Sequence, residues 1–200
     1  MTAKKIGIIG GSGFLGSSLS TLLDDSNIKY CSFDIDSSNN NEKKKFLDIE
    51  DQESLSQLND INTLINLAAI HRDDVRPISR YDDVNVEGAK NICSAAREHN
   101  ITKIIFTSSV AIYGFAPANT DESGKPNYFN DYGRTKYLAE KIYKDWYSED
   151  KKNRTLVIIR PTVIFGEGNR GNVYNLLRQI ASKRFAMIGN GKNKKSMAYV

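Results

Sequence analysis

Short apolar runs alternate with amphipathic segments along the 200-residue chain. Runs rich in β-branched and aromatic side chains predict buried strands, and apolar residues spaced by three and four positions predict helices. The strands expected from this pattern span residues 5–10, 30–34, 46–49, 63–68, 103–107 and 155–160. The expected helices span residues 14–24, 54–58, 83–99, 132–147 and 173–183, with a polar loop after residue 34 and a further element beginning at residue 197.

Strands and helices alternate in this order along the chain. Helical connections between parallel strands form right-handed crossovers. Continuously apolar strands are typical of a sheet that is buried on both faces. The pattern therefore predicts an α/β fold, a Rossmann-like doubly wound parallel sheet with helices on both faces.

The composition is that of a folded domain, with 40% hydrophobic and 26% charged residues. The net charge of +4 is small, and the lysines lie in short runs among Asn and Asp, which is typical of solvated loops rather than of a nucleic-acid interface. No apolar run has the length of a signal peptide or a membrane span. Two cysteines and two histidines do not suggest a disulfide framework or a metal site. We therefore expect a cytoplasmic protein without a metal, nucleic-acid or membrane partner.

A glycine-rich turn joins the first expected strand to the first expected helix. Its sequence, GGSGFLG from Gly10 to Gly16, fits both GxGxxG and GxxGxxG. Glycine permits a tight turn and lets a pyrophosphate approach the backbone, and the helix N-terminus that follows attracts the anion. We expect Gly10, Gly13, Phe14, Leu15 and Gly16 to bind a dinucleotide, although a turn without a ligand would need some of the same glycines.

An acidic residue, Asp34, ends the second expected strand. Its distance from the glycine turn is close to the roughly 20 residues at which a carboxylate binds the ribose 2′-hydroxyl. A carboxylate would repel a 2′-phosphate, and no Arg follows directly. The sequence therefore favours NAD over NADP.

Tyr132 and Lys136 lie four residues apart on an expected helix, hence on the same face. A phenol with a pKa near 10 is a poor acid or base at neutral pH, but a nearby ammonium together with an oxidised nicotinamide would lower that pKa. Ser108 and Ser109 follow the fifth expected strand, at the edge of the sheet where α/β folds bind ligands. One of these hydroxyls is expected to hold the reacting oxygen, and the other to satisfy backbone groups.

Together these stretches resemble the extended short-chain dehydrogenase/reductases, in particular the nucleotide-sugar epimerase/dehydratase family. The resemblance covers nearly the whole chain and includes Asn66 to Ala69, Asn85 to Gly88 and Arg160 to Gly166. It implies an NAD-dependent enzyme that forms a homodimer. It also implies that residues 1–166 form the NAD-binding domain and that residues 167–200 begin a substrate domain, which in the family continues well beyond this length.

The resemblance assigns roles to residues that spacing alone does not. It makes Ser109, Tyr132 and Lys136 the catalytic groups and lets Tyr132 and Lys136 also contact NAD. The further cofactor contacts that it implies are Asp48, Ile49, Leu67, Ala68, Ala69, Pro161 and Val163. His71 is a candidate substrate contact, for which a simple loop role is the alternative.

Departures from the family pattern narrow the chemistry. Val110 and Ala111 stand where the dehydratases carry Asp and Glu, so dehydration is not expected. Val163 stands where many 4-epimerases carry Asn. A 4-keto-sugar reductase or dehydrogenase is therefore expected as an alternative to a 4-epimerase. The expected substrate is a nucleotide-diphosphate sugar. The alternatives are a hydroxysteroid-type dehydrogenase and a catalytically silent NAD(P)-binding sensor.

Overall fold

The computed structural model describes residues 5–36, 43–72, 74–187 and 189–200, so most of the polar loop expected after residue 34 lies outside the described residues. The chain divides into two compact units, one ending at Arg160 and the other spanning Pro161–Val200. The boundary expected at residue 166 falls inside the second unit. How cofactor-binding and substrate-binding roles divide between the units stays a prediction.

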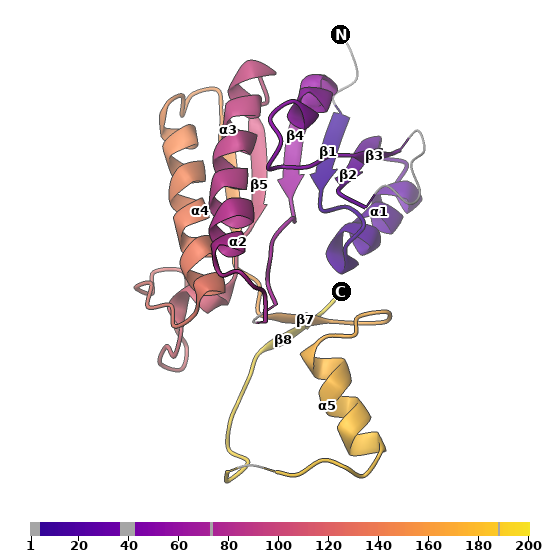
Figure 1. Ribbon diagram of the computed structural model, residues 1–200, viewed down its shortest axis with the longest axis vertical. Coiled ribbons are helices and arrows are strands. Elements are labelled where there is room, and N and C mark those ends of the chain that lie inside the picture. The colour runs from indigo at the N-terminus through magenta and orange to yellow at the C-terminus, as the bar shows by residue number, and fades with distance from the viewer. Residues whose placement is uncertain (1–4, 37–42, 73, 188) are drawn as a thin grey trace. The chain divides into compact units, whose positions relative to one another are not determined.

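The first unit contains a six-stranded parallel sheet with the strand order β3-β2-β1-β4-β5-β6 (Figure 1). Its strands are β1 Lys5–Ile9, β2 Tyr30–Asp34, β3 Lys44–Phe46, β4 Ile61–Asn66, β5 Lys103–Thr107 and β6 Thr155–Ile159. Its helices are α1 Phe14–Asp25, α2 Ser79–Asp82, α3 Gly88–Glu98 and α4 Asp131–Ser148. Short 3₁₀ turns lie at η1 Ser54–Asp60 and η3 Val110–Tyr113, and a π-helical turn, η2, spans Asp83–Glu87.

The strand order reverses between β1 and β4. From β1 the chain winds outward to β3, and it then returns and winds the other way from β4 to β6. Right-handed crossovers place α1 on one face of the sheet and α3 and α4 on the other. The predicted fold class is confirmed, and the reversal places a topological switch point at the carboxyl ends of β1 and β4, where such sheets bind ligands.

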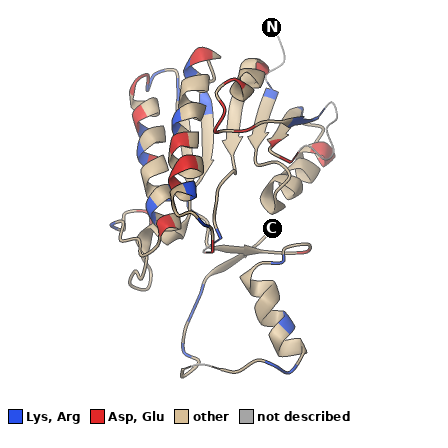
Figure 2. Ribbon diagram, viewed as in Figure 1, with Lys and Arg blue, Asp and Glu red and all other residues tan. Residues whose placement is uncertain are grey.

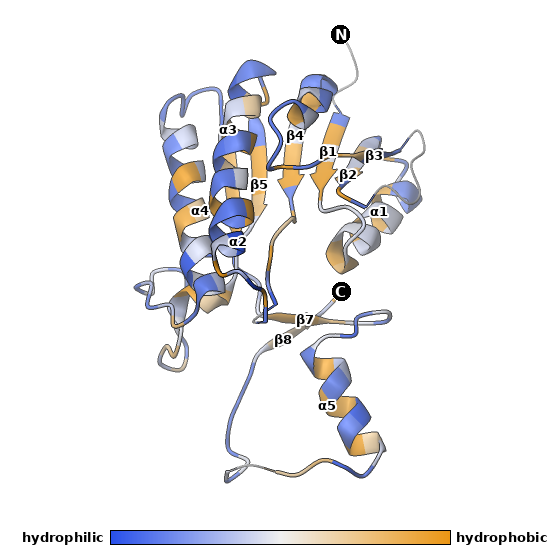
Figure 3. Cartoon of the chain, viewed as in Figure 1, coloured by the Kyte–Doolittle hydropathy of each residue, from blue (hydrophilic) through white to orange (hydrophobic). Residues whose placement is uncertain are grey.

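The core lies between the central strands and the helices that cover them. Figure 3 shows these strands as predominantly apolar. The residues Ile8, Leu64, Ile104, Tyr143 and Trp146 are each 0% exposed. Figure 2 shows acidic and basic residues interspersed on α3 and α4. These two helices therefore bury an apolar side and carry mixed charge on the rest of their surface.

Several expected elements differ from the pattern, including the strand expected over residues 63–68, which is β4 Ile61–Asn66. The third strand is Lys44–Phe46 rather than 46–49, because an edge strand pairs with β2 alone and does not need buried side chains. The helix expected over residues 83–99 begins as the π-helical turn η2 and continues as α3. A π-helical turn accommodates an extra residue and is often found at functional sites. Asn85 of this turn is buried.

The second unit pairs β7 Val163–Phe165 with β8 Met197–Tyr199 and carries α5 Asn172–Ala181. The sequence pattern did not predict β7, which has only three residues. Figure 3 shows apolar and polar residues on different sides of α5, which has no buried residue. Among the described residues, no helix combines the length and the apolar character needed to cross a membrane.

Candidate active site

The glycine turn packs tightly against the ends of β2 and β4. The backbone amides of Gly10 and Gly11 both donate to the carbonyl of Phe33, at 2.9 and 3.1 Å. Gly10 has a φ of +80°, and a Cβ at this position would lie 2.7 Å from the backbone nitrogen of Ala68. A Cβ on Gly16 would lie 2.4 Å from the carbonyl oxygen of Gly10. The fold itself therefore requires glycine at positions 10 and 16.

Gly13 is different because the protein leaves room beside it. A Cβ there would meet only the carbonyl oxygen of Gly10, at 3.3 Å. Gly13 is also the N-cap of α1 and provides no side-chain cap to the helix, whose first residues are Phe14 and Leu15. Packing constrains this position less than positions 10 and 16, and a glycine here also suits close approach of a pyrophosphate to the helix N-terminus. This cradle fits the dinucleotide expected from the sequence.

Asp34 lies directly beside the glycine turn, at the end of β2. One carboxylate oxygen accepts a hydrogen bond from the Ser12 amide at 2.8 Å, and the other accepts one from the Asp36 amide at 3.1 Å. The side chain is partly exposed and each oxygen has a further lone pair. The carboxylate is therefore fixed in place and able to accept hydrogen bonds from ribose hydroxyls.

The remaining predicted cofactor contacts of the first unit differ in their exposure to solvent. Leu67, Ala68 and Ala69 follow β4 and are partly exposed, and the amide of Leu67 donates to the carbonyl of Ile9 at 2.9 Å. They therefore lie at the switch point beside the glycine turn. Asp48 is partly exposed, whereas the Ile49 side chain is 5% exposed and belongs to the core. The exposed His71 lies in the loop after β4.

The two serines after β5 have different environments. Ser108 is 1% exposed, whereas Ser109 is partly exposed and is the N-cap of η3. The Ser109 hydroxyl accepts a hydrogen bond from the Ala111 amide at 3.1 Å. Because a hydroxyl can accept more than one hydrogen bond and donate one, Ser109 retains capacity for a substrate oxygen.

Tyr132 lies near the N-terminus of α4 and hydrogen-bonds with Ser109. Burial raises the pKa of its phenol, and the hydrogen bond with Ser109 lowers this pKa in part. The net direction within the protein is opposite to the lowering that the Tyr–Lys spacing suggested. Burial opposes the charged phenolate here. The fixed positive charge of an oxidised nicotinamide would act in the other direction.

Lys136 is 2% exposed and lies one turn after Tyr132. Its ammonium donates to the carbonyl of Thr107 at 2.7 Å and lies 4.7 Å from the centre of the Phe106 ring. Burial lowers the pKa of Lys136 to about 7, and the charge of Glu140 partly opposes this effect. The structure thus brings Ser109, Tyr132 and Lys136 together at the carboxyl end of β5.

The burial of Lys136 predicts a pH-dependent stability. Because its pKa falls from 10.5 to about 7 on folding, the unfolded chain binds the proton more strongly between these pH values. Relative to Lys136→Met, the wild type should therefore gain roughly 4 kcal/mol of unfolding free energy as the pH rises through this range. Urea denaturation at several pH values measures the difference. Lys141→Met, which removes an exposed lysine of the same helix, is the control variant.

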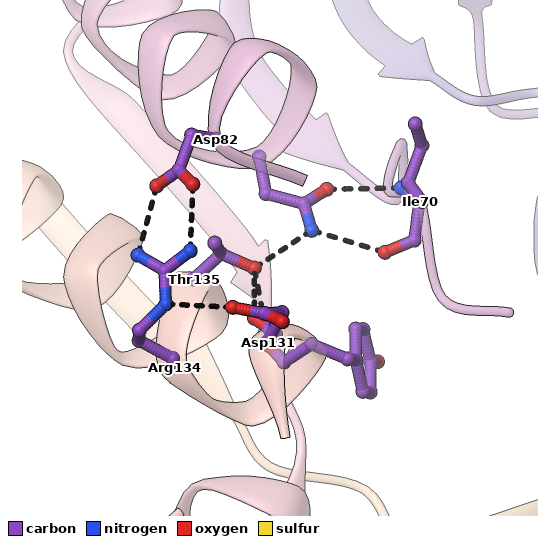
Figure 4. A network of polar contacts seen from close by, with 7 residues as sticks. Ile70, Asp82, Asp131, Arg134 and Thr135 are labelled. Carbon is purple, nitrogen blue, oxygen red and sulfur yellow. Dashed lines mark hydrogen bonds and ion pairs between the residues drawn. The ribbon is translucent and has the colours of Figure 1, made fainter. Parts of the chain in front are cut away.

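A polar network supports the N-terminal end of α4 (Figure 4). The Arg134 guanidinium donates to both carboxylate oxygens of Asp82, at 2.9 and 2.6 Å, and to Asp131 at 3.0 Å. The Asn85 amide nitrogen donates to the Thr135 hydroxyl and to the Ile70 carbonyl, each at 3.0 Å. These bonds connect the helix of Tyr132 to η2 and to the loop after β4.

The sequence reasoning missed one further buried group, the Glu140–Arg160 ion pair. Glu140 is 0% exposed, and Arg160 donates to both of its carboxylate oxygens, at 2.8 and 2.6 Å. Glu140 lies four residues after Lys136, so the same helical spacing that selected Lys136 could have indicated it. Arg160 begins the stretch from Arg160 to Gly166 that resembles the family.

The second unit contains the two remaining predicted cofactor contacts, Pro161 and Val163, both partly exposed. It also has a small hollow of about 100 Å³. The hollow is lined by Ile164, Phe165, Gly166, Asn169, Asn172, Val173, Tyr174 and Leu177. Ligand pockets usually measure about 300 Å³ or more, so this hollow is too small to hold a whole nucleotide sugar.

The glycine cradle, the carboxylate at the end of β2 and the Ser–Tyr–Lys group are the arrangement expected of the epimerase/dehydratase family. The chain belongs to the NAD dependent epimerase/dehydratase family, which its sequence matches over residues 6–200. It is 48% identical over 198 residues to N-acetyl-alpha-D-glucosaminyl-diphospho-ditrans,octacis-undecaprenol 4-epimerase of Escherichia coli O157:H7. That alignment covers 96% of this chain and 59% of the relative, so the chain spans less than two thirds of the relative's length. The family predicted from the sequence is confirmed.

Two further comparisons show similarity to proteins named for different substrates. The chain is 31% identical to the decarboxylating sterol-4-alpha-carboxylate 3-dehydrogenase of Mus musculus, over 99% of this chain and 56% of that protein. The crystal structure of UDP-glucose 4-epimerase from Brucella ovis in complex with NAD superposes with a TM-score of 0.73 at 27% identity. That superposition covers 82% of this chain and 53% of the epimerase.

Proposed function

We propose that the chain is the NAD-binding, catalytic part of a 4-epimerase that acts on a sugar joined to its carrier through a diphosphate. The observation that carries this proposal is the meeting of Ser109, Tyr132 and Lys136 beside a glycine turn with space for a pyrophosphate at Gly13. The E. coli relative at 48% identity supports a 4-epimerase and an N-acetylhexosamine on a polyprenyl diphosphate. The nucleotide carrier expected from the sequence is the alternative within the same chemistry.

In this proposal NAD is held by the glycine turn, Asp34 and the segment from Leu67 to Ala69, with Lys136 on its nicotinamide ribose. When bound, NAD supplies a reversible hydride acceptor for the sugar C4. The Tyr132 phenolate takes the proton of the C4 hydroxyl, and the Ser109 hydroxyl donates a hydrogen bond to the same oxygen. The keto sugar then rotates within the site so that it presents its opposite face. Tyr132 finally returns the proton to the same oxygen. Protons and hydride balance, so NAD is not consumed.

The test compares substrates that differ only in their carrier. The protein, produced from its complete gene, is incubated with N-acetylglucosamine linked to undecaprenyl diphosphate and, separately, to UDP, and the products are analysed by NMR and mass spectrometry. We expect the galacto epimer to form from the undecaprenyl substrate without net production of NADH. Epimerisation of the UDP substrate alone would reassign the carrier. Release of NADH would indicate a dehydrogenase, and the absence of any product would contradict the proposal.

The assembly and location of the protein belong to the same proposal. The family resemblance supports a homodimer in which α3 and α4 of two copies form a four-helix interface. The two free cysteines, Cys31 and Cys93, support a reducing compartment such as the cytoplasm. Light scattering during size-exclusion chromatography measures the mass in solution, and a monomer at micromolar concentration would contradict the dimer.

A further inference from the structure

The buried carboxylate of Glu140 needs an explanation beyond stability. It is 0% exposed and lies in α4 beside Ala139 and near Tyr143, both also 0% exposed. A buried carboxylate costs several kcal/mol unless it is paired, and a buried ion pair rarely stabilises a fold more than apolar residues of the same volume would. Such a pair is therefore a candidate for a role in holding other groups in place.

Arg160 makes more contacts than this pairing requires. Its Nε and Nη2 groups bind the two Glu140 oxygens in a bidentate arrangement, which fixes the plane of the guanidinium. The Nη1 group, left free by this arrangement, donates to the Tyr113 hydroxyl and, at 3.1 Å, to the carbonyl of Glu122. The guanidinium carbon also lies 5.3 Å from the centre of the Tyr113 ring. The ion pair thus lowers the pKa of Glu140 and raises that of Arg160 while it holds the Tyr113 side chain.

The residue held in this way ends the turn that begins at Ser109. The 3₁₀ turn η3 has Ser109 as its N-cap and Tyr113 as its last residue. The other side of Ser109 is also held by α4, because the Lys136 ammonium donates to the carbonyl of Thr107 at 2.7 Å. The segment from Thr107 to Tyr113 is therefore tied to α4 at both ends, with Ser109 between the two ties.

The residues of α4 that make these contacts are regularly spaced. Tyr132, Lys136 and Glu140 follow one another at intervals of four residues and so lie along one side of α4. Tyr132 reaches Ser109, Lys136 reaches Thr107, and Glu140 reaches Tyr113 through Arg160. Each contact is made one helical turn after the previous one.

We infer that Glu140 and Arg160 are positioning residues for the proposed reaction, because they hold the turn of Ser109 at a fixed place opposite Tyr132. This inference rests on the proposed function for the identity of the catalytic groups. Its physical basis is that catalytic hydroxyls act only within hydrogen-bond reach of the reacting atom, and displacements of about 1 Å can cost about 100-fold in rate.

Two variants test the Glu140–Arg160 ion pair and the Arg160–Tyr113 hydrogen bond separately. Glu140→Gln removes the charge that fixes Arg160 and should lower kcat by about 100-fold, with KM and NAD affinity within about twofold of the wild type. Tyr113→Phe keeps the buried ion pair intact and removes only the hydroxyl that Arg160 binds, so its fold is retained even if Glu140→Gln does not fold. It should lower kcat by roughly tenfold.

The matched control is Glu149→Gln. Glu149 is near the end of the same helix and accepts hydrogen bonds from Arg97 and Arg154, each with a 2.6 Å contact, but it is exposed and far along the helix from Tyr132. Its loss should leave kcat unchanged. A wild-type kcat in Tyr113→Phe, or a loss of NAD affinity that matches the loss of kcat, would overturn the inference.

A second measurement does not depend on epimerase activity. The titration of Tyr132 is measured by ultraviolet difference absorbance in the presence of NAD, with Tyr132→Phe as the background. Because the hydrogen bond with Ser109 lowers the pKa of Tyr132, displacement of Ser109 in Tyr113→Phe should raise the midpoint of this titration. An unchanged midpoint would overturn the inference. An inactive wild type with the shifted midpoint would contradict only the proposed function.

Discussion

Replacement of Tyr132 by phenylalanine is expected to lower turnover by about 1,000-fold and to leave NAD binding intact. Phenylalanine keeps the ring that is partly buried at the start of α4 but removes the hydroxyl that hydrogen-bonds with Ser109. Without this hydroxyl, no side chain at that position can exchange the proton of the sugar hydroxyl. Turnover is measured with the substrate of the proposed reaction, and NAD binding by calorimetry.

Tyr137→Phe is the control for this experiment. Tyr137 is on the same helix, and its ring contacts that of Tyr128 at 6.1 Å between centroids. Loss of its hydroxyl should change neither turnover nor NAD binding. Equal turnover in Tyr132→Phe and the wild type would contradict the catalytic assignment and favour a protein that binds NAD without catalysis.

The second large effect is expected at the glycine turn. Gly13→Ala places a methyl group where the nearest protein atom is 3.3 Å away, so the fold should tolerate the substitution with a small local shift. The same methyl group would occupy the space proposed for the pyrophosphate. We expect NAD affinity to fall by at least about 30-fold, which corresponds to roughly 2 kcal/mol, while the melting temperature without NAD stays close to that of the wild type.

Gly16→Ala provides the contrast. Its methyl group would lie 2.4 Å from the Gly10 carbonyl oxygen and 2.5 Å from the Gly11 Cα, and neither backbone atom can move freely. We expect this variant to lose about 2 kcal/mol or more of unfolding free energy before any ligand is added. If Gly13→Ala bound NAD as tightly as the wild type, the pyrophosphate would have to bind elsewhere.

Local sequence patterns predicted the central elements well because each of them has clear local signals. The strands Tyr30–Asp34 and Lys103–Thr107 begin and end where the apolar pattern placed them. Edge strands lack this information, since β3 consists of two lysines and a phenylalanine and has β2 as its strand neighbour. The π-helical turn at η2 has no counterpart in a 3.6-residue repeat and was likewise not predicted.

The Tyr–Lys spacing and the glycine pattern identified the candidate site, but they could not describe its electrostatics. Spacing predicts that Tyr132 and Lys136 share a face of α4, yet it does not reveal how deeply they are buried. Burial raises the pKa of Tyr132 and lowers that of Lys136. The connection from Glu140 to Tyr113 joins residues distant in the sequence through Arg160, so it depends on the tertiary fold.

The division of the chain between Arg160 and Pro161 has a consequence for inheritance. The side chains proposed to handle the proton, together with Arg160 that holds them in register, are encoded before this point. A recombination event at this junction would therefore transfer the side chains proposed for proton transfer as one segment.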